Sequence, residues 1–225
     1  MAVATDAARS GRGWAVSQVV LVRHGETAWS QTGQHTGVTE LPLTEIGERQ
    51  VAWIRPLLAG RTFGQILTSP REHARATATL LGWGQAETDS DLAEWDYGAY
   101  EGRTTAEIST ALGRPWRIWT DPLPAGDTPG ETLAQVAARA DRVLARISPV
   151  LRAGHDVALV AHSHILRVLT ARWLGAAPGL GAVLALSAGG VCELGQEHDD
   201  PVILSWNFSV SGGLSTANLP NLGNS

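Results

Sequence analysis

The sequence predicts an α/β protein, a three-layer α/β/α sandwich with a mostly parallel mixed sheet as its middle layer. Apolar, β-branched runs at residues 18–23 and 156–161 are typical of strands buried on both faces. Segments with helical spacing of Leu, Val and Ala lie between and after these runs. Strands that alternate with helices form a parallel sheet covered by helices on both faces, which is the predicted sandwich.

In the N-terminal half, the first strand covers residues 18–23 and ends at a turn that contains glycine. A helix is expected over residues 44–58, because the segment Thr44-Glu45-Ile46-Gly47-Glu48 resembles a capping box. A shorter apolar run predicts a further strand over residues 65–68.

In the C-terminal half, helical spacing of apolar residues predicts helices over residues 131–151 and 165–174. The strand over residues 156–161 follows Gly154 and separates these two helices. Glycines and acidic turns divide three short apolar segments, which we expect to add strands at one edge of the sheet. These segments are 182–186, 191–194 and 202–206.

The chain is expected to form one domain over residues 18–206, because glycine and proline fall between short periodic segments and mark no boundary between two domains. Residues 1–17 lack the apolar core of a secretory signal and are expected to be a loose leader on a cytoplasmic protein. Residues 207–225 are rich in Ser, Gly and Asn and are expected to be a loose tail. The sequence leaves a monomer and a homodimer open.

The composition excludes several classes of function. The 225 residues include 44% hydrophobic residues, which is enough for a sizeable core, but the longest apolar runs are too short to span a membrane. All 17 basic residues are arginines, so a lysine Schiff base and a lysine-bearing phosphate loop are excluded. Dispersed arginines and a net charge of -5 argue against a nucleic-acid surface. A small phosphorylated ligand fits this composition.

Two histidine motifs follow the two best predicted strands. Arg23-His24-Gly25-Glu26-Thr27 comes after the first strand, and His162-Ser163-His164 comes after the strand over 156–161. Open α/β sheets place their ligands at the carboxyl ends of such strands. Arg23 offers a planar donor fork for phosphate oxygens, and Gly25 leaves room for an anion to approach His24. The motifs together predict a phosphoryl pocket.

Further motifs appear in a fixed order along residues 18–206. They are Thr36-Gly37, Leu43-Thr44, Thr68-Ser69-Pro70, the segment 92–98, Gly130-Glu131-Thr132 and Ala161-His162. With the Arg-His-Gly-Glu-Thr signature, this series resembles the histidine phosphatase superfamily, in its phosphoglycerate mutase-like branch. Segments 33–37 and 94–102 and the pair Trp116 and Trp119 are most similar to actinobacterial acid phosphatases and fungal sedoheptulose-bisphosphatases. The resemblance implies a phosphoglycerate mutase-like fold and phosphoryl transfer without a cofactor.

The resemblance also implies roles for four residues. His24 matches the nucleophile that becomes transiently phosphorylated, which requires a neutral imidazole. Arg23 and His162 match the residues that hold the oxygens of the phosphoryl group. Glu94 matches the proton donor to the leaving oxygen, and we expect neighbouring aromatic residues to raise its pKa for that task.

Three weaker assignments follow from the same resemblance, and a fourth follows from the position of a histidine in the sequence. Ser30 falls where relatives often carry Asn, and Thr36 with the amide of Gly37 matches a turn that contacts phosphate. His164 opens a helix, where it either lines the pocket or forms a hydrogen bond at the helix terminus.

One position departs from the family pattern. The superfamily carries a second phosphate-binding arginine three residues after the proline of Ser69-Pro70, and this chain has His73 there. Arg71 and Arg75 point about 200° around a helix axis from that face, so they do not substitute for it. An imidazolium has two donors and a titratable charge, which predicts weaker and more acid-dependent phosphate binding at His73.

The sequence therefore predicts a phosphomonoester hydrolase that acts on a small phosphorylated metabolite, with a sugar phosphate as one candidate. A phosphoglycerate-type mutase is an alternative, although mutases of the family usually carry longer insertions and a lysine-bearing tail. A degenerate or repurposed phosphate-ligand site is another alternative, and His73 is its support. No metal is expected, because Cys192 has no cysteine partner and phosphoryl transfer already accounts for the strongest histidine pair.

Overall fold

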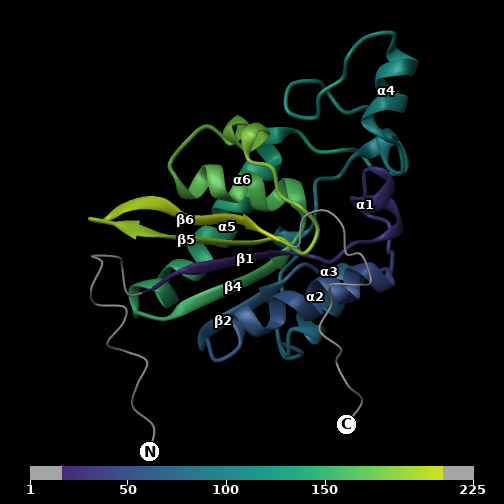
Figure 1. Ribbon diagram of the computed structural model, residues 1–225. Helices are drawn as coiled ribbons and strands as arrows, with labels where there is room; N and C mark the ends of the chain where they lie inside the picture. The colour runs from purple at the N-terminus through teal and green to yellow at the C-terminus, as the bar shows by residue number, and fades with distance from the viewer. Residues whose placement is uncertain (1–16, 210–225) are drawn as a thin grey trace, which may run out of the picture.

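A six-stranded mixed sheet forms the middle layer of the computed structural model, which describes residues 17–209 (Figure 1). Its strands, in the order β3-β2-β4-β1-β5-β6, are β1 (Val19–Arg23), β2 (Phe63–Thr68), β3 (Glu87–Thr88), β4 (Asp156–Ala161), β5 (Val191–Glu197) and β6 (Asp200–Phe208). Strands β1 to β4 run parallel to one another, whereas β5 runs antiparallel to both β1 and β6. The predicted mixed, mostly parallel sheet is confirmed.

Helices cover both faces of this sheet (Figure 1). The helices are α1 (Ala28–Thr32), α2 (Glu45–Leu58), α3 (Glu72–Leu80), α4 (Thr105–Leu112), α5 (Leu133–Arg152) and α6 (Ser163–Trp173), with 3-10 turns η1 (Ser90–Leu92), η2 (Gly98–Tyr100) and η3 (Pro178–Val183). Helices α2 and α3 pack on one face, and α5 and α6 pack on the other. The structure is therefore the predicted three-layer α/β/α sandwich.

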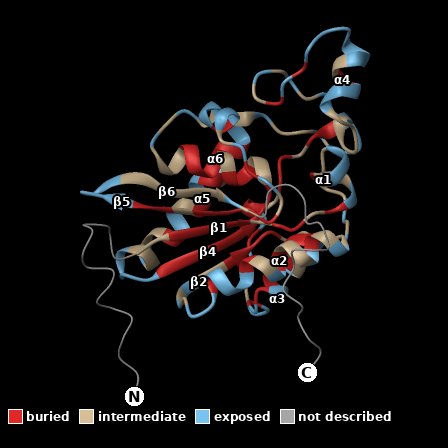
Figure 2. Cartoon of the chain, viewed as in Figure 1, coloured by how far each residue is buried: buried red, intermediate tan, exposed pale blue. Residues whose placement is uncertain are grey.

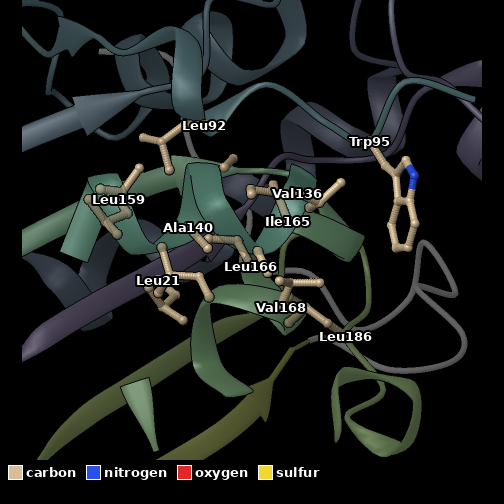
Figure 3. Close-up of a cluster of buried hydrophobic side chains, with 14 of the residues drawn as sticks. Leu21, Leu92, Trp95, Val136, Ala140, Leu159, Ile165, Leu166, Val168 and Leu186 are labelled. Atoms are coloured by element: carbon tan, nitrogen blue, oxygen red, sulfur yellow. The ribbon is translucent and has the colours of Figure 1, made fainter. Parts of the chain in front are cut away.

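The two central strands are the most deeply buried part of the sheet (Figure 2). All six residues of β4 are buried, as are the first four of β1. Alternate side chains of a strand face opposite layers, so Val20 and Val22 pack toward α2 and α3. Leu21 and Leu159 instead join the cluster under α5 and α6 (Figure 3). The β-branched, uniformly apolar composition of both strands suits this position.

Side-chain caps determine where the main helices begin. Thr44 caps α2 by accepting a hydrogen bond of 3.0 Å from the amide of Gly47. The reciprocal half of a capping box is missing there, because a glycine occupies the third helical position. Helix α5 begins at Leu133, two residues later than expected, because Thr132 and Gln135 form a complete capping box. Helix α6 is an exception without a side-chain cap, and it begins two residues earlier than expected, at Ser163.

The strand predicted over residues 182–186 is wrong. Part of it lies in the 3-10 turn η3, and the rest is irregular. The carbonyls of Gly181 and Ala182 accept hydrogen bonds of 2.8 and 3.0 Å from the guanidinium of Arg167. A side chain from α6 thus satisfies backbone groups that a neighbouring strand would otherwise bind.

The edges of the expected domain also differ from the structure. Strand β6 continues through Phe208, two residues beyond the expected end at residue 206. Asn207 belongs to the fold, because its side-chain oxygen accepts a hydrogen bond of 2.8 Å from the amide of Ser187. Residues 1–16 of the expected leader and 210–225 of the expected tail lie outside the described residues. Among residues 17–209, no helix combines the length and the apolarity needed to cross a membrane.

Candidate active site

The two histidine motifs meet at the carboxyl ends of β1 and β4. Arg23 and Ala161 are register partners in these adjacent parallel strands, so the residues after them lie side by side. The amide of His24 donates a hydrogen bond of 3.0 Å to the carbonyl of Ala161. The ring centroids of His24 and His162 are 5.1 Å apart, and both side chains are buried. The sheet topology alone therefore brings together residues that are 138 positions apart.

His24 has the protonation state that a nucleophile requires. Its Nδ1–H donates a hydrogen bond of 2.8 Å to the carbonyl of Gly25, which leaves the lone pair on Nε2. Burial lowers its pKa well below the ordinary histidine value, and the nearby His73, His162 and Arg23 add to the effect. His24 is therefore a neutral imidazole with one defined tautomer.

Gly25 is required for a reason other than access to the histidine. A Cβ atom built on Gly25 would lie 2.5 Å from the carbonyl oxygen of Gly47 in α2. The two glycines form a close backbone contact between the loop after β1 and the start of α2. Packing therefore requires a glycine at position 25, and the room that it leaves for an anion stays a prediction.

Arg23 supplies free hydrogen-bond donors to the site. Its Nη1 donates a hydrogen bond of 2.6 Å to the carbonyl of Leu186, which anchors the guanidinium. Its Nε is buried and has no hydrogen-bond partner among the described residues. Such an orphaned, charged donor is costly unless a ligand satisfies it. An anion with tetrahedral oxygens next to His24 is the natural acceptor.

A cavity of about 160 Å³ opens in front of these residues. It is lined by Arg23, His24, Ser30, Gly33, Gln34, His35, Thr36, Glu94, Tyr97, Ser163 and His164. This volume is below the range for drug-sized ligands, and most of the lining side chains are polar. Burial lowers the pKa of His35 to about 4, so this residue is neutral in the cavity wall. The cavity suits a small anionic group better than a large apolar ligand.

Glu94 lines the cavity, but its electrostatic setting is the reverse of the one expected. Its carboxylate accepts hydrogen bonds of 2.9 to 3.0 Å from the amides of Trp95, His164 and Ile165. Burial raises the pKa of Glu94, but the hydrogen bonds and positive potential from His164 outweigh it and hold the pKa well below the ordinary value. The expectation that aromatic neighbours raise this pKa is wrong, because two of the three amides belong to the first turn of α6.

Tyr97 and His164 form the wall beside Glu94. The hydroxyl of Tyr97 and Nδ1 of His164 share a hydrogen bond of 2.7 Å. His164 Nδ1 also lies 3.7 Å from the Glu94 carboxylate. His164 thus combines both expected roles, because its ring lines the cavity and its amide holds Glu94 at the start of α6.

His73 faces the nucleophile from α3. Its ring centroid is 4.4 Å from that of His24, and its Nε2 is 3.2 Å from Nδ1 of His162. Burial lowers the pKa of His73, which disfavours the positive form on which the predicted acid-dependent phosphate binding depends. Arg71 points away, with its Nε donating a hydrogen bond of 3.1 Å to the carbonyl of Gly37. Position 73 therefore faces the site, whereas Arg71 does not.

One of the weaker assignments is corrected by the structure, and those of Ser30 and Thr36 stay predictions. The amide of Gly37 donates to the carboxylate of Glu101 at 2.9 and 3.0 Å, so it is not free to contact a phosphate. The hydroxyl of Ser30 lines the cavity, but it is engaged in the capping box of α1 with Thr27. Thr36 also lines the cavity, where its hydroxyl makes only a long hydrogen bond of 3.4 Å to the carbonyl of Gln34.

Sequence reasoning missed two supporting residues. The hydroxyl of Ser69 lies 2.6 Å from Nε2 of His162 and holds that ring in place. Glu101 accepts hydrogen bonds from three successive amides, 37 to 39, and orders the loop beside the cavity. Ser69 belongs to the motif Thr68-Ser69-Pro70 and Glu101 to the segment 94–102, but only the folded chain shows what their side chains contact.

The arrangement can support two kinds of chemistry. A neutral imidazole, a buried guanidinium and a carboxylate around a small cavity suit transfer of a phosphoryl group to His24. One nitrogen each of His24, His73 and His162 lie within 4.8 Å of one another, so these residues could also hold a metal ion. The prediction that no metal is bound considered the pair His24 and His162 and did not consider His73 as a third ligand.

Known proteins match this chain over nearly all of the residues that the structure describes. The model of the histidine phosphatase superfamily (branch 1) matches residues 19–209. An acid phosphatase of Mycobacterium tuberculosis is 38% identical over 188 residues, which are 80% of this chain and 87% of the relative. The sedoheptulose 1,7-bisphosphatase of Saccharomyces cerevisiae is 38% identical over 185 residues, 69% of this chain and 67% of the relative. Among solved structures, that of the open reading frame Rv3214 of Mycobacterium tuberculosis has a TM-score of 0.79 and 35% sequence identity. The match covers 86% of this chain and 98% of the Rv3214 chain.

Proposed function

Because the chain belongs to the histidine phosphatase superfamily (branch 1), we propose that it is a phosphomonoester hydrolase that forms a phosphohistidine on His24. The superfamily indicated by the motifs is thereby confirmed. The observation that carries the proposal is the neutral His24, with its Nε2 lone pair free, in the wall of a cavity shared with Arg23 and Glu94.

In the first step, Nε2 of His24 attacks the phosphorus atom and the bond from phosphorus to the alcohol oxygen breaks. Negative charge on the transferring group is balanced by the free Nε–H of Arg23. The Nδ1–H of His162 adds a donor when it exchanges its contact with His73 for a phosphoryl oxygen. Burial lowers the pKa of His162 to about 3, so His162 acts as a neutral donor and not as a cation. Glu94 gives its proton to the departing alkoxide, which leaves as the alcohol.

The proton on Glu94 comes from the substrate. In the empty site Glu94 is ionised, because amide donors and His164 hold its pKa well below the ordinary value. A phosphomonoester has a second pKa near ~6, so at mildly acidic pH it enters as a monoanion that carries one proton. The negative charge of the bound phosphoryl group also raises the pKa of Glu94, and the proton moves to the carboxyl before the alcohol leaves.

In the second step, the Glu94 carboxylate takes a proton from water and the resulting hydroxide attacks the phosphorus atom. The bond from phosphorus to Nε2 breaks and His24 returns to the neutral state. Glu94 passes its proton to the inorganic phosphate, which leaves as the monoanion, and is ionised again. The reaction needs no metal ion, because a side chain supplies the nucleophile and Arg23 supplies the positive charge.

The substrate is a small phosphorylated metabolite, and a sugar phosphate is the best candidate. The cavity of about 160 Å³ accommodates a phosphoryl group with little more, so the rest of the substrate lies at the mouth of the cavity. Polar groups there, such as His35 and Gln34, suit the hydroxyls of a sugar. The relatives named above include a sedoheptulose 1,7-bisphosphatase, which agrees with this class.

The test is a panel of sugar phosphates and p-nitrophenyl phosphate, assayed for phosphate release with EDTA present. We expect turnover, and rapid acid-free quenching should trap a base-stable, acid-labile phosphate on His24. Transfer of the phosphoryl group between sugar positions without release would support the mutase instead. Absence of turnover on every phosphomonoester, restored by His73→Arg, would support a degenerate or repurposed site.

A further inference from the structure

The three buried histidines around the nucleophile form a cluster that phosphoryl transfer alone does not explain. His24 follows β1, His73 lies in α3 and His162 follows β4, so three separate elements converge on one point. The ring centroids lie 4.4, 5.0 and 5.1 Å apart. We call this group the histidine triplet.

Each histidine of the triplet uses one ring nitrogen to bind an oxygen outside the triplet. His24 Nδ1 bonds the carbonyl of Gly25 at 2.8 Å, and His73 Nδ1 bonds the carbonyl of Leu41 at 3.1 Å. Nε2 of His162 lies 2.6 Å from the hydroxyl of Ser69. Metal-ligating histidines show this pattern, in which an outer oxygen fixes the tautomer and the other nitrogen faces the metal.

The carbonyl partners determine the tautomers of two of the rings. A carbonyl only accepts, so Nδ1 carries the hydrogen in His24 and in His73. Both rings are neutral, and Nε2 of each therefore presents a lone pair. Without a cation, the Nδ1–H of His162 donates a hydrogen bond of 3.2 Å to the lone pair of His73, and the hydroxyl of Ser69 donates to Nε2 of His162. A cation can replace this proton when His162 takes its other tautomer, donates its Nε2–H to Ser69 and presents the lone pair of Nδ1 beside Nε2 of His73.

The distances fit a tetrahedral cation of the size of zinc. Zinc-to-nitrogen bonds of about 2.0–2.1 Å at a tetrahedral angle separate two ligand nitrogens by roughly 3.3 Å. The nitrogens of His73 and His162 are 3.2 Å apart. One nitrogen of each residue lies within 4.8 Å of the others, so the ring of His24 has to approach by at most about 1.5 Å. Three histidines then leave the fourth position for water or another small ligand.

The charge state of the triplet also suits a cation. Burial favours the neutral form of all three imidazoles, and only a neutral imidazole ligates a metal. The ionised carboxylate of Glu94 lies in the wall of the same cavity and offsets the positive charge of Arg23. An arginine at position 73 would exclude a cation, because it has no lone pair and a permanent charge.

We propose that His24, His73 and His162 form a site for a divalent transition metal such as Zn²⁺, and that the bound metal inhibits the enzyme. The lone pair of His24 Nε2 cannot attack phosphorus while it is donated to the metal, so metal binding and phosphoryl transfer exclude each other. The effect on activity rests on the proposed function, whereas the metal site itself does not.

The test uses the full chain, freed of metal with EDTA and dialysed. Co²⁺ serves as the probe, because tetrahedral Co²⁺ absorbs visible light and can be titrated directly. We expect one Co²⁺ per chain with a tetrahedral spectrum, displaced by Zn²⁺. One equivalent of Zn²⁺ should abolish hydrolysis of p-nitrophenyl phosphate, and EDTA should restore it.

Three variants identify the ligands. His73→Arg should bind Co²⁺ roughly a hundredfold or more weakly, and its hydrolysis should resist Zn²⁺. Ser69→Ala removes the outer partner of His162 and should weaken Co²⁺ binding roughly 10–100-fold, which also covers the case in which His73→Arg folds poorly. His198→Asn is the matched control for exposed histidines, because it lies in the β5–β6 turn, and its binding should equal that of the wild type.

Specific outcomes would overturn the metal site. These are the absence of a tetrahedral spectrum, equal binding by the wild type and His73→Arg, or an increase of activity with Zn²⁺. If the protein shows no hydrolysis in EDTA, the proposed function fails while the Co²⁺ titration still decides the metal site. If hydrolysis is present and Co²⁺ does not bind, the metal site fails alone.

Discussion

Replacing Glu94 by Gln separates proton donation from substrate binding. The carboxylate accepts three amide hydrogen bonds, two on Oε1, from Trp95 and Ile165, and one on Oε2, from His164. A glutamine whose oxygen takes the Oε1 position keeps the first two and places its NH₂ group against the amide of His164. The variant thus loses one acceptor and the titratable proton, with little change in shape.

The magnitudes follow from these contacts. One buried amide left without an acceptor costs about 1–3 kcal/mol of the free energy of unfolding, so the variant should fold with a lower melting temperature. A positioned general acid contributes about 10²–10⁴-fold to the rate. Alkyl phosphates, whose alkoxides need that proton, should lose this factor in kcat. Aryl phosphates such as p-nitrophenyl phosphate need little protonation and should lose about tenfold or less.

The assay compares kcat for a sugar phosphate and for p-nitrophenyl phosphate in the wild type and the variant, with EDTA present. Glu131→Gln is the matched control, because Glu131 also accepts amide and guanidinium donors beneath the segment that carries Glu94. Its rates on the two substrates should change by the same factor. Equal losses on both substrates in Glu94→Gln would refute the acid role and make Glu94 a positioning residue.

Four further predictions test the site, each with EDTA present. His24→Ala should abolish hydrolysis and phosphate labelling while the far-ultraviolet circular dichroism stays unchanged, and residual turnover would contradict a covalent role. His73→Arg should tighten phosphate binding by about 1–3 kcal/mol in calorimetry, unless the position does not contact phosphate. On the acid side, kcat/KM should begin to fall only well below pH 6.5, because the lowered pKa of His24 keeps the nucleophile neutral down to that range. On the alkaline side, activity should decline above pH ~6, because the substrate loses the proton that Glu94 needs. An alkaline optimum would refute this pH dependence. Burial lowers the pKa of His162 to about 3, so as the pH falls below 6.5 this histidine takes up a proton in the unfolded chain but not in the folded one. Folding stability therefore falls with pH, and between pH 7 and 5 the wild type should lose about 2 kcal/mol more than His162→Asn, measured by urea unfolding.

The layers of the fold could be predicted from the sequence because local patterns encode them. Uniformly apolar, β-branched runs occur where strands are buried on both faces, and β1 and β4 follow that pattern closely. The segment 182–186 has the same local pattern but forms no strand, because the Arg167 side chain binds the carbonyls of Gly181 and Ala182. That contact joins residues from different elements, and periodicity carries no information about it.

In the candidate site, too, some features follow from the local sequence and others depend on tertiary contacts. The sequence by itself determined which residue types are present, their order and their position at strand ends, and these were enough to place His24 beside His162. Only the tertiary structure decided their protonation. Glu94 is ionised because the start of α6 donates amides to it, and His73 is neutral because it is buried against two other histidines. A pKa depends on desolvation and on charges within a few ångströms, and these neighbours come from distant parts of the chain.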